Sequence, residues 1–152
     1  MIEMSDGDLL NSEAGAIVNA VNCVSVMARG LALQFRSAFP ENYKAYKKAC
    51  RRGEVQIGKM FIYPLGELSS PQYIINFPTK DHWRDPSKVE YIQSGLSALI
   101  ADVQRLKLTS IAIPALGCGL GGLEWSEVRP LIEEAFEALP DMQVTLFPPR
   151  RE

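Results

Sequence analysis

Short apolar runs alternate with longer amphipathic segments along this chain. The run from Ala16 to Val18 is apolar and stops at the polar Asn19, as expected of a buried strand. From residue 28 to Phe39, apolar side chains recur with a period near 3.6, which predicts a helix that ends before Pro40. The same reasoning predicts further strands at 59–63, 73–77, 110–113 and 144–147, and further helices at 41–50, 88–106 and 125–139.

Because strands and helices alternate throughout, we expect one α/β domain of three layers. Polar residues at the ends of the segments indicate caps and turns. Ser87 directly precedes the helix at 88–106 and is expected to cap it. Residues 6–10 are expected to form a turn after a short first strand, and residues 11–13 to cap one helical turn.

Two strand-to-helix connections contain glycine. After Asn22 a loop passes through Gly30 into the first long helix, and after the strand at 110–113 a second loop is rich in glycine over residues 117–122. Backbone N–H groups of such loops approach phosphate oxygens closely, because glycine has no side chain. Two such loops at the carboxyl ends of strands predict a cradle for a ligand of about pyrophosphate size.

Composition narrows the class of protein. The chain has 152 residues, 47% of them hydrophobic, and a formal net charge of −2, as is common for one globular domain. No apolar run approaches the roughly 18 residues of a membrane span, and the first residues lack a signal-peptide pattern. Cys23, Cys50 and Cys118 are far apart and His82 is the single histidine. We therefore expect a reduced, cytoplasmic protein without a structural metal or disulfide. We further expect it to need no cofactor and to be a monomer.

Charge is unevenly distributed. The segment from Arg36 to Lys59 contains seven basic and two acidic residues, whereas acidic residues dominate after Lys88. A basic surface of this kind follows a phosphodiester backbone in nucleic-acid-binding proteins. The alternative, a solvated helix face without a ligand, remains open at this point.

Lys80 is the strongest candidate for a reactive group. It lies in a segment bounded by Pro78 and Pro86, which we expect to be a loop, beside Phe77 and Trp83. Shielding from water by apolar neighbours favours the neutral amine, which is a nucleophile and forms Schiff bases with aldehydes. An exposed lysine, or one that contacts phosphate, is the alternative.

His82, Trp83 and Arg84 follow Lys80 and suit contact with DNA, because aromatic side chains stack on unpaired bases and basic ones bind phosphates. His82 is also a candidate proton shuttle. The alternative is that Trp83 closes the core beneath the loop while His82 is exposed. Cys118 has no neighbouring histidine in the sequence and is interpreted as a packing residue rather than a nucleophile.

Several motifs together resemble the macrodomain family, α/β/α domains with a central mixed sheet that hold ADP-ribose. They are Gly7-Asp8-Leu9-Leu10, Asn19-Ala20-Val21-Asn22 and the glycine loop that ends at Leu123. Within this family the chain is similar to the DNA ADP-ribosyl glycohydrolases, on the basis of residues 30–35, 76–83 and 86–88. The resemblance spans essentially the whole chain.

The resemblance implies a hydrolase that removes ADP-ribose from thymidine in single-stranded DNA, as the antitoxin to a DNA ADP-ribosyltransferase. Residues 1–152 would then be a single macrodomain, the N-terminal catalytic domain of a longer antitoxin. In that case residues 148–152 are either a tail or the start of a linker. Two alternatives stay open: a module that binds ADP-ribose without cleaving it, and a hydrolase of ADP-ribosyl-glutamate or O-acetyl-ADP-ribose.

The resemblance also implies roles for individual residues. Lys80 would be catalytic, attacking the anomeric carbon or stabilising ring opening. Asp8 would accept from the adenine amino group, although the residues alone favour a turn or helix cap there. Asn22 would bind ribose hydroxyls, with capping of its loop as the alternative. The residues implied in ADP-ribose binding are Asp8, Leu9, Asn19, Asn22, Met27, Gly30, Leu31, Thr79, Gly117, Cys118, Gly119, Leu120, Gly121 and Gly122.

The chain departs from the family pattern at three positions. Ser25 and Ala28 replace glycines that relatives carry in the loop after Asn22, so any positive φ there is harder to reach. Gly121 stands where the animal terminal ADP-ribose protein glycohydrolase has a catalytic aspartate. The DNA-specific branch also has glycine there, which favours ADP-ribosylated DNA over ADP-ribosylated protein as the substrate.

Overall fold

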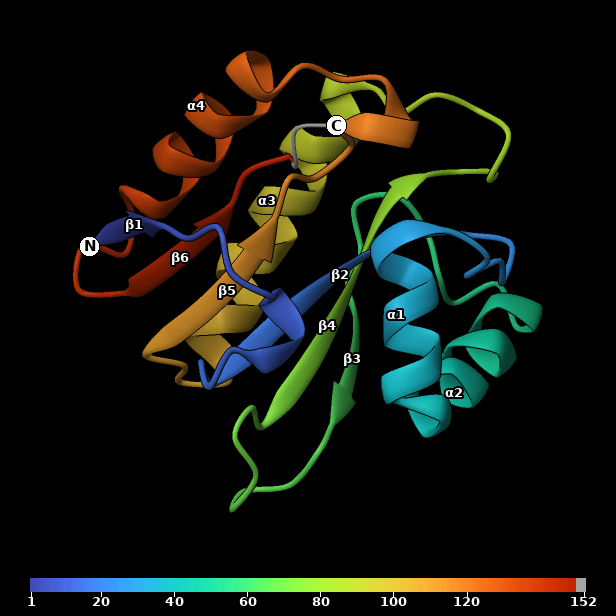
Figure 1. Ribbon diagram of the computed structural model, residues 1–152, viewed down its shortest axis with the longest axis horizontal. Coiled ribbons are helices and arrows are strands. Elements are labelled where there is room, and N and C mark those ends of the chain that lie inside the picture. The colour runs from blue at the N-terminus through green and yellow to red at the C-terminus, as the bar shows by residue number, and fades with distance from the viewer. Residues whose placement is uncertain (150–152) are drawn as a thin grey trace.

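The computed structural model describes residues 1–149 and consists of a six-stranded sheet between two layers of helices (Figure 1). The sequence from residue 150 onward, which includes most of the predicted tail, lies outside the described residues. In chain order the elements are β1 (Ile2–Met4), η1 (Leu9–Asn11), β2 (Ala16–Asn22), α1 (Gly30–Ala38), α2 (Pro40–Arg51), β3 (Phe61–Pro64), β4 (Tyr73–Lys80), α3 (Val89–Arg105), β5 (Ser110–Pro114), η2 (Gly119–Gly121), α4 (Trp125–Phe136) and β6 (Gln143–Phe147).

The sheet is mixed, as expected. Its strand order is β1-β6-β5-β2-β4-β3, and every neighbouring pair is parallel except β3 with β4. After β2 the chain forms β3 and β4, which lie on one side of β2 in the sheet. It then crosses to the other side of β2, where it forms β5 and β6. In a parallel sheet such a reversal of direction opens a crevice at the carboxyl ends of the two central strands. This edge is therefore where a ligand site is expected.

Each face of the sheet has its own apolar core, because side chains alternate along the strands. Val18 and Ile75 belong to the larger cluster, which α3 and α4 cover. Ile17 and Ile74 face the other way and pack with Phe35 of α1. A third cluster joins Val21 and Met27 to the inner face of α2. In Figure 1, α1 and α2 lie together on the right of the sheet, apart from α3 and α4.

The predicted elements all form, but several boundaries differ. β4 continues to Lys80, so the first part of the segment after Phe77 is strand rather than loop. The helical turn near the N-terminus is Leu9–Asn11, and Asp8 caps it by accepting from the Leu10 N–H at 3.0 Å. Residues 11–13 therefore do not act as the cap. The last helix ends at Phe136 rather than at residue 139.

The expected cap of α3 is also wrong. The N-cap of α3 is Lys88, which makes no side-chain cap hydrogen bond. Ser87 is buried and turned elsewhere. By contrast, the expected break between the first two helices is confirmed at Pro40, which occupies the first turn of α2, where its missing N–H leaves no bond unmade.

Gly95 fixes how closely α3 approaches the sheet. A Cβ atom there would overlap the ring of Phe77, which is fully buried on β4. We expect Gly95→Ala to lower the free energy of unfolding by about 1–3 kcal/mol despite the better helix propensity of alanine, because overpacking outweighs it. Urea denaturation measures this.

The exposed Ser97→Ala variant in the same helix serves as the control and should be neutral or slightly stabilising. Adding Phe77→Leu to Gly95→Ala should recover part of the loss, since it removes the overlapping ring. A Gly95→Ala protein as stable as the wild type would contradict this account of the packing.

Candidate functional site

The carboxyl ends of β2 and β4 meet at the expected edge. Asn22 lies opposite Lys80 in the parallel register, just after an irregularity between Val21 and Asn22. The backbone stays joined one step further, where the Cys23 N–H donates to the carbonyl of Asp81 at 3.2 Å. The loops that follow these two strands therefore begin side by side.

Lys80 connects the β4 edge to the glycine loop. Its Nζ donates to the carbonyl oxygens of Leu120, at 3.1 Å, and of Trp83, at 3.4 Å. The apolar setting expected from Phe77 is absent, because that ring is buried under α3 instead. The Lys80 side chain is half-buried, and its polar neighbours are backbone carbonyls. A single ammonium thus bonds both the loop after β4 and the glycine loop, whose Leu120 lies 40 residues after Lys80 in the sequence.

The glycine loop follows β5 and turns back through η2. Gly117, Gly119 and Gly122 have φ values of 72°, 65° and 85°, a region that side-chain-bearing residues rarely adopt. Within residues 1–149, the N–H groups of Gly119 and Leu120 donate to no other residue, as is usual for the first N–H groups of a helical turn. Such N–H groups are suited to the oxygens of an anion.

Cys118 lies in this loop and fits the packing role expected of it. Its thiol is half-buried and lies near Glu124 and Glu127 of the following helix. Burial, and secondarily the two carboxylates, raises the pKa of the Cys118 thiol to about 11. Since the thiolate is the nucleophile, Cys118 is poorly reactive at neutral pH.

Asn22 organises the loop that follows it. Its Oδ1 accepts hydrogen bonds from the N–H groups of Val24 and Val26, and its Nδ2 donates to the Val26 carbonyl at 2.8 Å. The buried Tyr46 hydroxyl of α2 donates to Asn22, with its oxygen 2.6 Å from the backbone carbonyl and 3.0 Å from Oδ1. Desolvation strongly raises the pKa of Tyr46, so its hydroxyl stays protonated as a donor. Sequence reasoning missed Tyr46.

Ser25 adopts the positive φ that was expected to be hard to reach without a glycine. It has a φ of 69°, although it carries a side chain. Its carbonyl accepts from the Tyr43 hydroxyl at 3.3 Å. Together with the bonds from Asn22 on either side, this contact holds the residue in a strained conformation. Ala28 has no positive φ.

Asn19 lies deeper, in a buried amide cluster. Its Nδ2 donates to the Asn76 side chain of β4, and Asn76 exchanges hydrogen bonds with Asn42 of α2. The Oδ1 of Asn19 has no hydrogen-bond partner among the described residues. Met27 is fully buried beside this cluster, with its sulfur 3.9 Å from the Asn19 Nδ2. The cluster ties β2, β4 and α2 together.

The remaining residues of the expected ADP-ribose set lie around this edge. Asp8 is exposed and uses one carboxylate oxygen as the cap of η1, while Leu9 is buried in the cluster that includes Ala112 of β5. Gly30, with a φ of 55°, opens α1, and the half-buried Leu31 packs on the same cluster as Leu9. Thr79 on β4 is buried, as is Gly121 in the glycine loop.

His82, Trp83 and Arg84 form a stack in which Trp83 and Arg84 are exposed and His82 is half-buried. The rings of His82 and Trp83 are 5.7 Å apart, and the Arg84 guanidinium lies 4.9 Å from the centre of the Trp83 ring. Trp83 is 45% exposed, so the alternative in which it closes the core is wrong. The backbone N–H of Arg84 donates to Nδ1 of His82, which fixes the turn. An exposed aromatic surface therefore lies next to Lys80.

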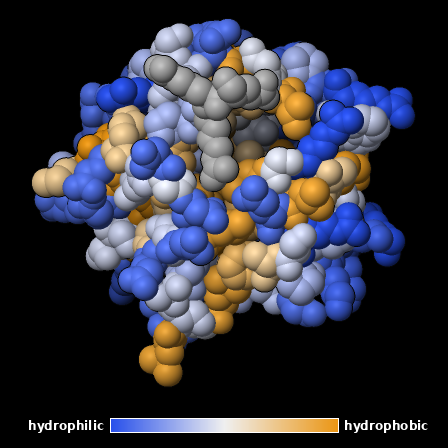
Figure 2. Space-filling view, viewed as in Figure 1, coloured by the Kyte–Doolittle hydropathy of each residue, from blue (hydrophilic) through white to orange (hydrophobic). Residues whose placement is uncertain are grey.

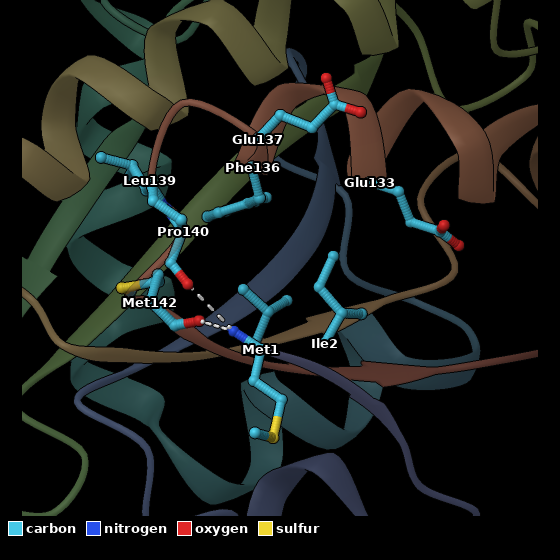
Figure 3. Close-up of a pocket in the computed structure, with 9 residues that line it drawn as sticks. Met1, Ile2, Glu133, Phe136, Glu137, Leu139, Pro140 and Met142 are labelled. Atoms are coloured by element: carbon cyan, nitrogen blue, oxygen red, sulfur yellow. Dashed lines mark hydrogen bonds between the residues drawn. The ribbon is translucent and has the colours of Figure 1, made fainter.

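A separate pocket of about 170 Å³ lies at the opposite edge of the sheet, where β1 and β6 begin (Figure 3). There the Met1 amino group donates to the carbonyl of Met142 at 2.7 Å and to that of Pro140 at 3.4 Å. The pocket has no contact with the loops around Lys80. Within residues 1–149, no cluster of three metal-binding side chains occurs, and no helix is long and apolar enough to cross a membrane.

A six-stranded mixed sheet with a glycine-rich loop at its crevice agrees with the comparison to protein families. The Macro domain family matches residues 18–132. The chain belongs to the macrodomain family. The resemblance inferred from its motifs is therefore confirmed at the level of the family.

Individual relatives show which members of the macrodomain family this chain is similar to. A DNA ADP-ribosyl glycohydrolase of Mycobacterium tuberculosis is 52% identical over 149 residues, which is 98% of this chain and 42% of the relative. The solved macrodomain of Mycobacterium tuberculosis DarG has a TM-score of 0.96 at 51% identity and covers 99% of both chains. Thermosipho africanus DarTG, solved in complex with ADP-ribose, has a TM-score of 0.90 at 34% identity, over 99% of this chain and 43% of that one. This chain thus spans about two fifths of the length of the DNA ADP-ribosyl glycohydrolases that it matches.

Ser25 provides a test of strain in the loop after β2. Ser25→Gly should raise the free energy of unfolding by up to about 1 kcal/mol, because glycine tolerates the positive φ, although the more flexible unfolded chain offsets part of the gain. Ser25→Val should lower it by about 1–2 kcal/mol, since a branched side chain is worst at this φ. Chemical denaturation of the macrodomain measures both.

Val24→Gly is the matched control, because Val24 lies in the same loop without a positive φ, and glycine there should only destabilise. Equal stability of the glycine and valine variants at residue 25 would contradict a strained Ser25.

Proposed function

We propose that this macrodomain is a hydrolase that removes ADP-ribose from thymidine in single-stranded DNA. The observation that carries the proposal is Lys80, which stands at the end of β4 opposite Asn22 and is hydrogen-bonded to the glycine loop. An amine at the junction of the loop after β2 and the glycine loop is well placed to attack the anomeric carbon of an ADP-ribose held by both loops. The relatives named DNA ADP-ribosyl glycohydrolases support the choice of substrate.

In the proposed complex, the free N–H groups of Gly119 and Leu120 bind the pyrophosphate. The carboxylate oxygen of Asp8 that is not used in the cap accepts from the adenine amino group. Asn22 keeps one N–H beyond its bond to Val26 and directs it to the distal ribose. The solved complex of Thermosipho africanus DarTG with ADP-ribose supports this ligand.

The reaction breaks the bond between the anomeric carbon and the base nitrogen. The base leaves with a proton, and water supplies a hydroxyl to the anomeric carbon, which releases free ADP-ribose. Lys80 acts in one of two ways. As a nucleophile it gives a proton to the departing base and forms a transient bond from Nζ to that carbon, which water then breaks; as a cation it stabilises the opening sugar ring. No cofactor is needed for either route.

The position of the basic helix supports a nucleic-acid substrate. Tyr46 and Tyr43 of α2 bond to the loop after β2, so the helix borders the same edge as Lys80. The outer face of α2 carries exposed lysine and arginine side chains. In Figure 2 the right-hand side, where α1 and α2 lie in Figure 1, is largely hydrophilic. We propose that the strand stacks a base on Trp83 and that its backbone follows Lys47, Lys48, Arg51 and Arg52.

The proposed biological role is that of an antitoxin to a DNA ADP-ribosyltransferase. A Thermosipho africanus relative named a fusion of such a transferase with a DNA ADP-ribosyl glycohydrolase supports the pairing of the two activities. Because the relatives named DNA ADP-ribosyl glycohydrolases are more than twice as long as this chain, the macrodomain is proposed as the catalytic part of the protein.

A reader that binds ADP-ribose without cleaving it is the second candidate. Two observations favour it: the Lys80 ammonium is already held by two carbonyls, and residue 121 beside it is a glycine and not a carboxylate. A reader needs the glycine loop but not the lysine. The two functions therefore differ in the effect of removing Lys80.

Lys80→Ala should lower the release of ADP-ribose from a thymidine-modified oligonucleotide by at least about 100-fold, because the reactive amine is lost. Its affinity for free ADP-ribose, measured by calorimetry, should stay within a few-fold of the wild type. Mass spectrometry of the oligonucleotide follows the reaction.

Two variants frame this result. Lys107→Ala changes an exposed lysine that lies just after the carboxyl end of α3, and it should behave as the wild type. Gly119→Glu should abolish binding and turnover, because it places a carboxylate against the phosphates at a residue with positive φ. Binding without turnover by the wild type would identify a reader, and turnover only of a glutamate-linked or acetylated substrate would identify the other hydrolase class.

The basic helix is tested separately with an unmodified single-stranded oligonucleotide. Arg51→Glu should weaken binding and reduce the slope of log K against log salt by about 0.7 or more, the value expected for each lost phosphate contact. Lys107→Glu changes the net charge equally at the far end of the domain and should leave the slope unchanged. Equal effects of the two variants would show that only net charge matters.

A further inference from the structure

Ser87 is a buried hydroxyl with no structural task. It is 5% exposed, and its Oγ has no hydrogen-bond partner within residues 1–149. It does not cap α3, although it precedes that helix in the sequence. A buried polar group without a partner lowers stability, so its presence calls for another explanation.

The surroundings of Ser87 supply one. Its backbone N–H donates to the carbonyl of Gly121 at 2.9 Å, which holds it against the glycine loop. A Cβ atom on Gly121 would lie 2.6 Å from the Ser87 Oγ and 3.9 Å from Cε of Lys80. Both the hydroxyl and the lysine therefore lie beside the position that a side chain of residue 121 would occupy, and glycine leaves that position open.

Lys80 has a spare hydrogen-bond donor that the unpartnered hydroxyl of Ser87 can accept. Its ammonium carries three N–H groups, and two of them are directed at the carbonyls of Trp83 and Leu120. The Leu120 carbonyl belongs to the same loop whose N–H groups face the proposed phosphate site, so a bound ligand and Lys80 engage the same turn. The Ser87 hydroxyl, which lies on the same side of Gly121 as the lysine chain, is an acceptor without a partner of its own.

We infer that Ser87 is a positioning residue for Lys80. Its hydroxyl accepts an N–H from Lys80 when substrate draws the lysine away from the two carbonyls, and this bond holds Nζ beside the glycine loop. Gly121 is required because any side chain there would separate the two groups. The step forms and breaks hydrogen bonds only. It rests on the proposed function of Lys80 as the reactive group.

The first experiment is Ser87→Ala, assayed on the oligonucleotide with ADP-ribosylated thymidine. We expect kcat to fall roughly ten- to a hundredfold, the range of a lost hydrogen bond to a charged group, with KM and the Kd for ADP-ribose changed less than about twofold. The melting temperature should stay the same or rise, since an unpartnered buried hydroxyl is removed. A purely structural serine would not produce lower kcat together with unchanged or higher stability.

Gly121→Ala and the double variant Gly121→Ala/Ser87→Ala separate positioning from packing. Gly121 has no positive φ, so alanine is resisted there only by contact with Ser87. If Ser87 matters only for space, removing its hydroxyl relieves the crowding and the double variant regains the activity that Gly121→Ala lost. If the hydroxyl positions Lys80, the double variant stays as slow as Ser87→Ala.

The outcomes distinguish this inference from the proposed function. Turnover by the wild type with Ser87→Ala at full rate, or recovery in the double variant, would overturn the role of Ser87 and leave the hydrolase intact. Failure of the wild type to release ADP-ribose would overturn both. A slow Ser87→Ala that binds ADP-ribose normally, joined by an equally slow double variant, would support the inference.

Discussion

The parallel pairing of β2 with β4 is the constraint on which the site depends. It holds Asn19 opposite Asn76 and Asn22 opposite Lys80, with the register broken only between Val21 and Asn22. A shift of one residue would turn the apolar side chains of both strands to the wrong face, so the two buried cores maintain the register. The amide cluster adds directional bonds to α2, where slippage would leave buried amides unpaired. Stability and the placement of Lys80 thus have one origin.

The site also couples two loops that the sheet alone does not join. β5 lies on the far side of β2 from β4, yet Lys80 reaches the carbonyl of Leu120 in the loop after β5. This contact crosses the crevice at the switch in strand order, where the backbone leaves room for it. The glycines permit the approach: a Cβ at Gly117 would press on Leu123, and one at Gly121 would press on Ser87.

The sequence predicted the order of elements well, because hydrophobic period and breakers such as Pro40 are local signals. The sequence placed Lys80 in a loop, whereas β2 pairing extends the strand to it, and pairing partners are not visible locally. The hydrogen bonds of Asn22 with Tyr46 were missed for the same reason, since 24 residues separate the two. The prediction for Ser87 was wrong because a serine directly before a helix favours an N-cap. Only the structure shows that its side chain is packed against Gly121 instead.

The unequal distribution of charge has a consequence at a distance. With bases on α2 and acidic residues along α4, on either side of the crevice, a nearly neutral domain acquires an electric dipole moment. Such a field orients a polyanion before contact and turns it toward the basic side of the crevice. At physiological ionic strength the field is screened over about 8 Å, so this orientation acts in the last stage of an encounter. For the proposed nucleic-acid substrate, the rate of capture, and not only the affinity, would thereby be linked to where the helices lie.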